Sequence, residues 1–299
     1  MVYDLIIKNG KVFIEDELIN IDLFINEEKI VKMEINSTEN DAIKVIDAKG
    51  MYVLPGGVDP HVHIRDPGHT ERETFLSGTM AAAAGGVTTI IEHPISNPPQ
   101  YNPKILKNRI NLALANCVID FAFLGAAGSK HLDEIENLSR YGIVGYKTFL
   151  HPAPTGREFE FEGLTMENDG DIIEGLNEVK KTNLPCVIHA ENDDIIKSAT
   201  KMINDEDLDN PLSHALSRPL ISEVETVEKL IRFSEYTGAK IILAHTSSSE
   251  AMSLVKKAKL ESSNIILETC PHYLLCCEKD LKRLGVFAKC NPPLRSEYE

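Results

Sequence analysis

Histidines recur where predicted β-strands end, and imidazole is a side chain that binds divalent metals. His61 and His63 form a His-x-His pair in a strand-like run, so both rings point to the same face and can hold one ion. His189 ends the apolar run Pro-Cys-Val-Ile-His, and His245 ends Ile-Ile-Leu-Ala-His. A single histidine of this kind is more often structural. Three strands that all deliver histidine are hard to explain by packing alone, and the pattern predicts a metal centre.

Lys147 is the other chemically notable side chain. It lies in the apolar run Gly-Ile-Val-Gly-Tyr-Lys-Thr-Phe-Leu, where a free ammonium would be costly. Two interpretations remain open. The lysine reaches the strand end or pairs with a carboxylate, or it is carbamylated by CO₂ and its new carboxylate bridges two metals roughly 3.5–4 Å apart.

Alternating strands and helices after Met51 must position these side chains. The alternation predicts parallel strands and right-handed crossovers, hence an α/β fold of the (β/α)8 TIM-type barrel that lacks its last unit. A doubly wound open sheet is the alternative, weakened by the absence of a glycine-rich dinucleotide loop. Strands are expected at 58–64, 87–92, 118–124, 143–150, 185–190, 240–246 and 264–269. Helices are expected near 72–84, 103–115, 131–140, 170–182, 192–205, 222–237, 248–260 and 278–284.

The first fifty residues predict a small β-sandwich-like unit without a helix. Asn9-Gly10 between two apolar runs predicts a β-hairpin. The predicted domains are therefore a small β unit, 1–53, and the barrel, 54–299. The expected strands of the small unit are 3–8, 11–14, 20–25, 29–35 and 43–47.

Composition narrows the classes of partner. The 299 residues carry 46 acidic and 31 basic side chains, a formal net charge of −15, which disfavours nucleic-acid and membrane-surface binding. No apolar run is long enough to span a bilayer, and the first residues lack a basic region and a long apolar core, so we expect no secretory signal. The six cysteines show no zinc-ribbon spacing and no disulfide framework, so we expect reduced thiols and a cytoplasmic protein.

Taken together, these residues resemble the amidohydrolase superfamily, and within it the cyclic amidases: dihydroorotases, allantoinases and hydantoinases or dihydropyrimidinases. The resemblance implies two divalent ions, usually zinc, with carbamylated Lys147 bridging an ion on His61 and His63 to one on His189 and His245. It also implies attack of metal-activated water on a ring amide carbonyl, a small cyclic amide as partner, and a homodimer or homotetramer. The motifs that carry it are Pro55-Gly-Gly57, residues 79–89, His189-Ala-Glu-Asn192, Cys270-Pro-His-Tyr273 and Asn291-Pro-Pro-Leu-Arg295.

One departure from the family concerns the general acid/base. The family's aspartate at the end of the eighth strand binds a metal and moves the proton, and no residue up to Glu299 matches it. We therefore expect a fragment or a truncated product that is inactive or poorly folded as given, or else a non-catalytic scaffold relative. The retained metal ligands argue against the scaffold.

Arg65 resembles the dihydroorotase position that pairs with the substrate carboxylate, a task suited to a planar guanidinium. The alternative is a salt bridge at the barrel rim with Asp66 or Glu73. Asn291 and Asn97 resemble substrate contacts of the same enzymes.

Other motifs resemble allantoinases instead. Ile95 replaces a substrate-contacting asparagine of dihydroorotases, and Glu268-Thr-Cys-Pro-His-Tyr and Ser217-Arg-Pro219 are allantoinase-like. His93 replaces a usual methionine. Because a site sets function more than a scaffold does, we expect a dihydroorotase of pyrimidine biosynthesis first, and an allantoinase or hydantoinase/dihydropyrimidinase as the alternative.

Overall fold

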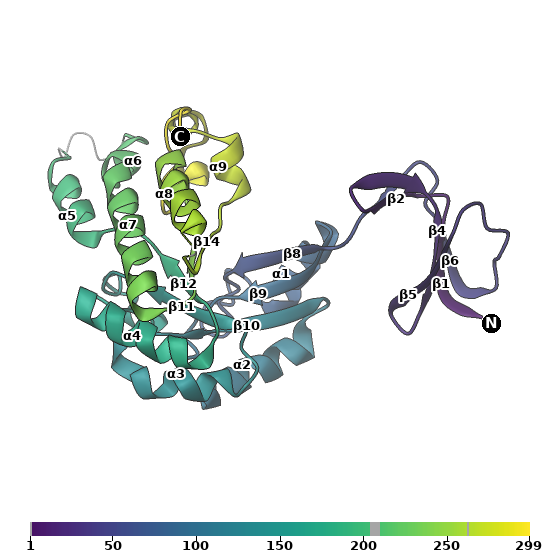
Figure 1. Ribbon diagram of the computed structural model, residues 1–299, viewed down its shortest axis with the longest axis horizontal. Coiled ribbons are helices and arrows are strands. Elements are labelled where there is room, and N and C mark those ends of the chain that lie inside the picture. The colour runs from purple at the N-terminus through teal and green to yellow at the C-terminus, as the bar shows by residue number, and fades with distance from the viewer. Residues whose placement is uncertain (1, 204–209, 262) are drawn as a thin grey trace. The chain divides into compact units, whose positions relative to one another are not determined.

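The computed structural model describes residues 2–203, 210–261 and 263–299 and divides into two compact units, Met1–Gly57 and Val58–Glu299 (Figure 1). The six cysteines are free thiols. Over the described residues, no helix combines the length and the apolarity that crossing a bilayer requires.

The N-terminal unit consists of two small sheets. One has the strand order β5-β4-β1-β6 and the other β3-β2-β7, and Ile6 and Phe24 are fully buried in the first. The strands are β1 (Tyr3–Lys8), β2 (Lys11–Ile14), β3 (Glu17–Asn20), β4 (Asp22–Asn26), β5 (Lys29–Glu34), β6 (Ala42–Asp47) and β7 (Tyr52–Val53).

The predicted hairpin across Asn9-Gly10 is wrong. β1 pairs with β4 and β6, whereas β2 pairs with β3 and β7, so the chain passes from one sheet to the other at this turn. The Asn9 N–H donates to Asp22 Oδ1 at 2.9 Å, which directs the chain away from β1. The tight hairpin joins β2 to β3 instead, where Glu15 and Asp16 both have positive φ (49° and 66°), as a type I′ turn requires.

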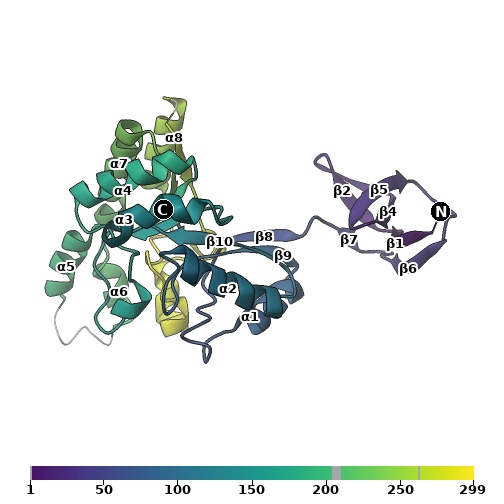
Figure 2. The same ribbon diagram turned by 90° about the horizontal axis from the view of Figure 1, so that it is seen from below.

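The second unit is built on a seven-stranded sheet whose strands follow chain order without reversal, β8 to β14. Neighbouring strands from β9 to β14 pair in parallel, and the sheet curls (Figures 1 and 2). A doubly wound sheet would reverse its strand order, so the barrel-type α/β prediction is confirmed. The strands are β8 (Gly57–Val62), β9 (Val87–Glu92), β10 (Asp120–Ala126), β11 (Gly145–Phe149), β12 (Cys186–His189), β13 (Ile241–Leu243) and β14 (Ile265–Leu267).

Helices follow the strands, and their ends are set by local sequence. Asn102, Asn168 and Ser248 cap helix N-termini through side-chain oxygens, and Gly238 ends a helix at φ 70°. The α-helices are α1 (Phe75–Ala84), α2 (Pro103–Asn116), α3 (Leu132–Ser139), α4 (Asp169–Thr182), α5 (Asp193–Lys201), α6 (Ser213–Leu216), α7 (Leu220–Thr237), α8 (Ser249–Leu260), α9 (Pro271–Leu275) and α10 (Leu281–Leu284). Short 3₁₀ turns are η1 (Ser129–His131), η2 (Glu158–Glu160), η4 (Glu278–Asp280) and η5 (Gly285–Ala288).

The helical layer is continuous: α1, α2, α3, α4, α7 and α8 each pack on the next (Figure 1). Between this layer and the sheet lies one large apolar core. The helix expected at 192–205 is observed as α5, and residues 204–205 lie outside the described part of the chain. Because the strands are parallel, their carboxyl ends share one edge of the sheet, where the predicted ligands lie.

Candidate metal centre

The carboxyl ends of four strands bring the five predicted ligands into one cavity. His61 lies in β8 and His63 just beyond it, Lys147 lies in β11, His189 ends β12, and His245 follows β13 by two residues. The cavity has a volume of about 340 Å³. Its lining also includes Arg65, Ile95, Phe149, His151, Pro154, Arg157, Phe161, Arg218 and Asn291.

The histidine rings form a contiguous cluster in this cavity. His189 Nδ1 and His245 Nε2 are 3.1 Å apart, and the ring centroids of His61 and His245 are 5.3 Å apart. Two imidazole nitrogens bound to a tetrahedral zinc at about 2.0–2.1 Å stand about 3.3 Å from each other, close to the first distance. His63 joins the cluster at 5.2 Å from His61, centroid to centroid.

Two carboxylates orient rings of the cluster. Glu268 accepts a hydrogen bond from His61 Nδ1 at 2.6 Å, so the free lone pair of the His61 ring is on Nε2. Glu191 accepts from His189 Nε2 at 2.8 Å, so the lone pair of that ring lies on Nδ1, facing His245. Carboxylates behind metal-binding histidines fix the tautomer and ring plane in this way. The sequence pattern predicts neither role, although Glu191 lies two residues after His189.

Burial keeps the rings neutral, as metal ligands must be. It lowers the pKa of His61 and lowers the pKa values of His63, His189 and His245 well below the usual range. Burial also lowers the pKa of Lys147 to about 8.

The donor set fits a pair of divalent cations. Lys147 Nζ is fully buried and has no hydrogen-bond partner among the described residues. Buried polar atoms are normally paired, so an unpaired amine on a lysine that lines this cavity indicates a missing ligand. Neutral imidazoles suit zinc and similar ions.

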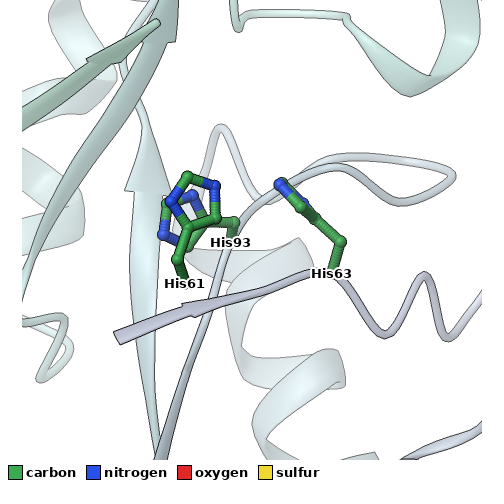
Figure 3. Close-up of side chains that lie close together, drawn as sticks. All are labelled: His61, His63 and His93. Atoms are coloured by element: carbon green, nitrogen blue, oxygen red, sulfur yellow. The ribbon is translucent and has the colours of Figure 1, made fainter. Parts of the chain in front are cut away.

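His93, which follows β9, lies beside this cluster (Figure 3). One ring nitrogen from each of His61, His63 and His93 lies within 4.8 Å of the other two. The rings of His93 and His61 stack at 3.8 Å with an interplanar angle of 15°. In-plane lone pairs of stacked rings are parallel, so they do not converge on one ion. His93 Nε2 lies 3.1 Å from the Pro60 carbonyl oxygen, to which it donates, and the anchored ring supports the plane of His61.

The predicted substrate-binding residues are only partly brought together. Arg65 and Asn291 line the cavity, whereas Asn97 is exposed and lies outside its lining. Arg65 is in a salt bridge, but its partner is Glu160 and neither Asp66 nor Glu73.

Removing either orienting carboxylate is expected to weaken metal binding. Glu268→Gln and Glu191→Gln should each lower zinc affinity by about 10–100-fold, because the ring behind each loses its fixed tautomer. Competition with a chromophoric chelator measures this. Glu136→Gln, in an exposed pair with Arg140, is the matched control. Unchanged affinity in both cavity variants would contradict the assigned roles.

The chain is similar in sequence and structure to known proteins. A sequence model described as the amidohydrolase family matches residues 52–288. The chain is 35% identical over 294 residues to an allantoinase of Desulfitobacterium hafniense (strain Y51), covering 98% of this chain and 64% of the relative. It is 32% identical over 297 residues to an allantoinase of Escherichia coli O1:K1 / APEC, covering 99% of this chain and 64% of the relative.

Solved structures give the same result. The L-hydantoinase (dihydropyrimidinase) from Arthrobacter aurescens superposes with a TM-score of 0.92 at 29% identity, over 99% of this chain and 64% of that chain. The chain thus spans just under two thirds of the length of the relatives it matches. The chain belongs to the amidohydrolase family, and the relatives and solved structures it resembles are named allantoinase and hydantoinase (dihydropyrimidinase).

Proposed function

We propose that this protein is a metal-dependent hydrolase that opens a cyclic amide ring. The observation that carries the proposal is the convergence of four neutral histidines and one buried, unpaired lysine in a single cavity at the strand ends. Similarity to proteins named allantoinase and hydantoinase supports the substrate class.

His61 and His63 would hold one ion, His189 and His245 the other, and carbamylated Lys147 would bridge them. When bound, two divalent ions polarise an amide carbonyl and lower the pKa of water to about 7. Zinc is the proposed metal because the ligands are imidazoles. The free cysteines support a cytoplasmic location, and the resemblance to the family supports a homodimer or homotetramer.

The chain's own side chains prepare the cavity for a ring. Ile95, Phe149 and Phe161 are buried together and provide an apolar wall that keeps bulk water from the reacting carbonyl. Asn291 also lines the cavity, and a side-chain amide can donate to a ring oxygen. Glu268 and Glu191 hold the rings of His61 and His189 in fixed orientations through hydrogen bonds.

An uncharged ureide, such as allantoin or a hydantoin, is the ring we propose first. The Arg65 guanidinium, which would otherwise be available to a ring carboxylate, is already paired with Glu160. Dihydroorotate is the second candidate, favoured by the presence of both Arg65 and Asn291 in the cavity lining.

A substrate panel on the protein expressed from its complete gene tests the proposal. Allantoin or hydantoin should be hydrolysed with a kcat/KM at least about tenfold above that of L-dihydroorotate, with about two zinc ions per chain and loss of activity to chelators. Arg65→Ala should leave the order of the substrates unchanged.

Preferred turnover of dihydroorotate that collapses in Arg65→Ala would establish the second candidate instead. Protein purified without chelator that contains no metal and an unmodified Lys147 would favour a non-catalytic scaffold.

A further inference from the structure

Glu160 is a buried carboxylate in the segment that follows β11, and it pairs with two arginines that line the cavity of the candidate metal centre. Only 4% of its surface is exposed, and both of its oxygens are engaged. Oε2 accepts from Arg65 and, at 2.7 Å, from Arg157. Oε1 accepts from Arg157 Nε at 3.2 Å and lies 3.1 Å from His69 Nε2. Although burial acts in the opposite direction, Arg157 and Arg65 hold the pKa of Glu160 below its usual range, so it is an anion.

The two arginines that Glu160 binds both line the cavity. Among the described residues, the arginines in its lining are Arg65, Arg157 and Arg218, and the third is paired with the buried Glu191. These three arginines are therefore paired with two carboxylates of this chain, and Arg65 and Arg157 share Glu160. A carboxylate on an incoming ring would have to displace one of these partners or lie beside it.

We propose that Glu160 is a specificity-determining residue that occupies Arg65 and Arg157 and thereby excludes rings bearing a carboxylate. The inference rests on the proposed function and deepens it, because it assigns the cavity to uncharged rings. Two carboxylates around one guanidinium repel each other, and this repulsion between like charges in a desolvated site lowers the affinity for a ring that carries a carboxylate. An uncharged ring meets no such repulsion and uses the apolar wall and the neutral donors.

Uracil and uracil-6-carboxylate (orotate) form a matched pair of probes, since they share one ring and differ by a single carboxylate. Calorimetric titration of the zinc-loaded protein should show orotate binding no more tightly than uracil. Glu160→Gln removes the competing charge and keeps the shape of the side chain. It should tighten orotate by at least about tenfold and leave uracil within about twofold.

Two further variants make the test specific. Glu162→Gln changes a carboxylate of the same segment that bonds to His131 and Lys130 and lies outside the cavity lining, so both affinities should stay as in the wild type. Adding Arg65→Gln to Glu160→Gln should remove part of the gained orotate affinity, because one of the two freed guanidiniums is then absent and only Arg157 remains.

The outcomes separate this inference from the proposed function. A cavity that binds neither ring contradicts the proposed function. Binding of uracil with an orotate-to-uracil ratio unmoved by Glu160→Gln overturns the role of Glu160 alone. If that variant does not fold, Arg65→Gln in the wild-type background decides. If Arg65→Gln leaves the ratio of orotate affinity to uracil affinity unchanged, Arg65 is already occupied in the wild type, as the inference requires. If Arg65→Gln lowers that ratio tenfold, Arg65 binds the ring carboxylate directly and the inference is overturned.

Discussion

Lys147→Met is expected to abolish binding of the metal pair and to lower ring-opening activity by at least about 10³-fold, because metal activation of water and carbonyl supplies several kcal/mol of transition-state stabilisation. Methionine fills a similar volume but cannot form a carbamate. Metal analysis and turnover of the preferred ring measure the loss. Lys240→Met, at an exposed lysine beside β13, should leave metal content and activity unchanged.

The same substitution should stabilise the metal-free chain, which separates its functional effect from misfolding. Burial lowers the pKa of Lys147 from 10.5 to about 8, so below pH 8 the protonated lysine destabilises the fold by about 3 kcal/mol. This penalty is lost as the pH rises from 8 towards 10.5. In the presence of chelator, Lys147→Met should therefore raise the free energy of unfolding at pH 7 and have little effect near pH 10.5. A metal-free variant less stable than the wild type at pH 7 would contradict this account.

Arg109→Met is expected to destabilise the second unit by about 3–5 kcal/mol, because it leaves a buried carboxylate without its partner. Arg109 is 1% exposed and Glu92 fully buried, and Arg109 Nη2 donates to Glu92 Oε1 at 2.7 Å. Arg109 also donates to Gln100 Oε1 at 2.6 Å and, through Nε, to the Asp66 carbonyl at 3.1 Å. Glu92 in turn accepts from the backbone N–H of Ile64. The network thus ties α2 and β9 to the segment that carries His63.

Urea denaturation at pH 7 measures the loss. Burial raises the pKa of Glu92 even with Arg109 beside it, so without Arg109 the acid form should be favoured and the loss should shrink as the pH falls. Arg109→Met combined with Glu92→Gln should recover part of the stability, because no unpaired charge remains. Arg140→Gln, which breaks the exposed pair with Glu136, should cost less than about 1 kcal/mol. If Arg109→Met also lowered the free energy of unfolding by less than about 1 kcal/mol, the buried pair of Arg109 and Glu92 would contribute little to stability.

Sequence alone determined the properties that depend on near neighbours. The alternation of apolar strands with helices fixed a parallel sheet in chain order. The positions of His61, His189 and His245 at or near strand ends placed them on one edge, because parallel strands all end on the same side. The apolar residues around Lys147 in the sequence indicated an unusual, buried lysine. The structure brings this lysine into the same cavity as the histidines.

Only the tertiary structure decided which distant side chains meet. Glu268 reaches His61 across 207 positions of the chain, and Glu160 reaches Arg65 across 95. The error at Asn9-Gly10 has the same origin, since β1 and β2 are neighbours in sequence but join different sheets. Spacing encodes which face of a strand or helix a residue occupies. Residue spacing does not tell which side chain lies across the cavity. Packing of the whole core decides this, because it sets where separate strand ends and loops meet.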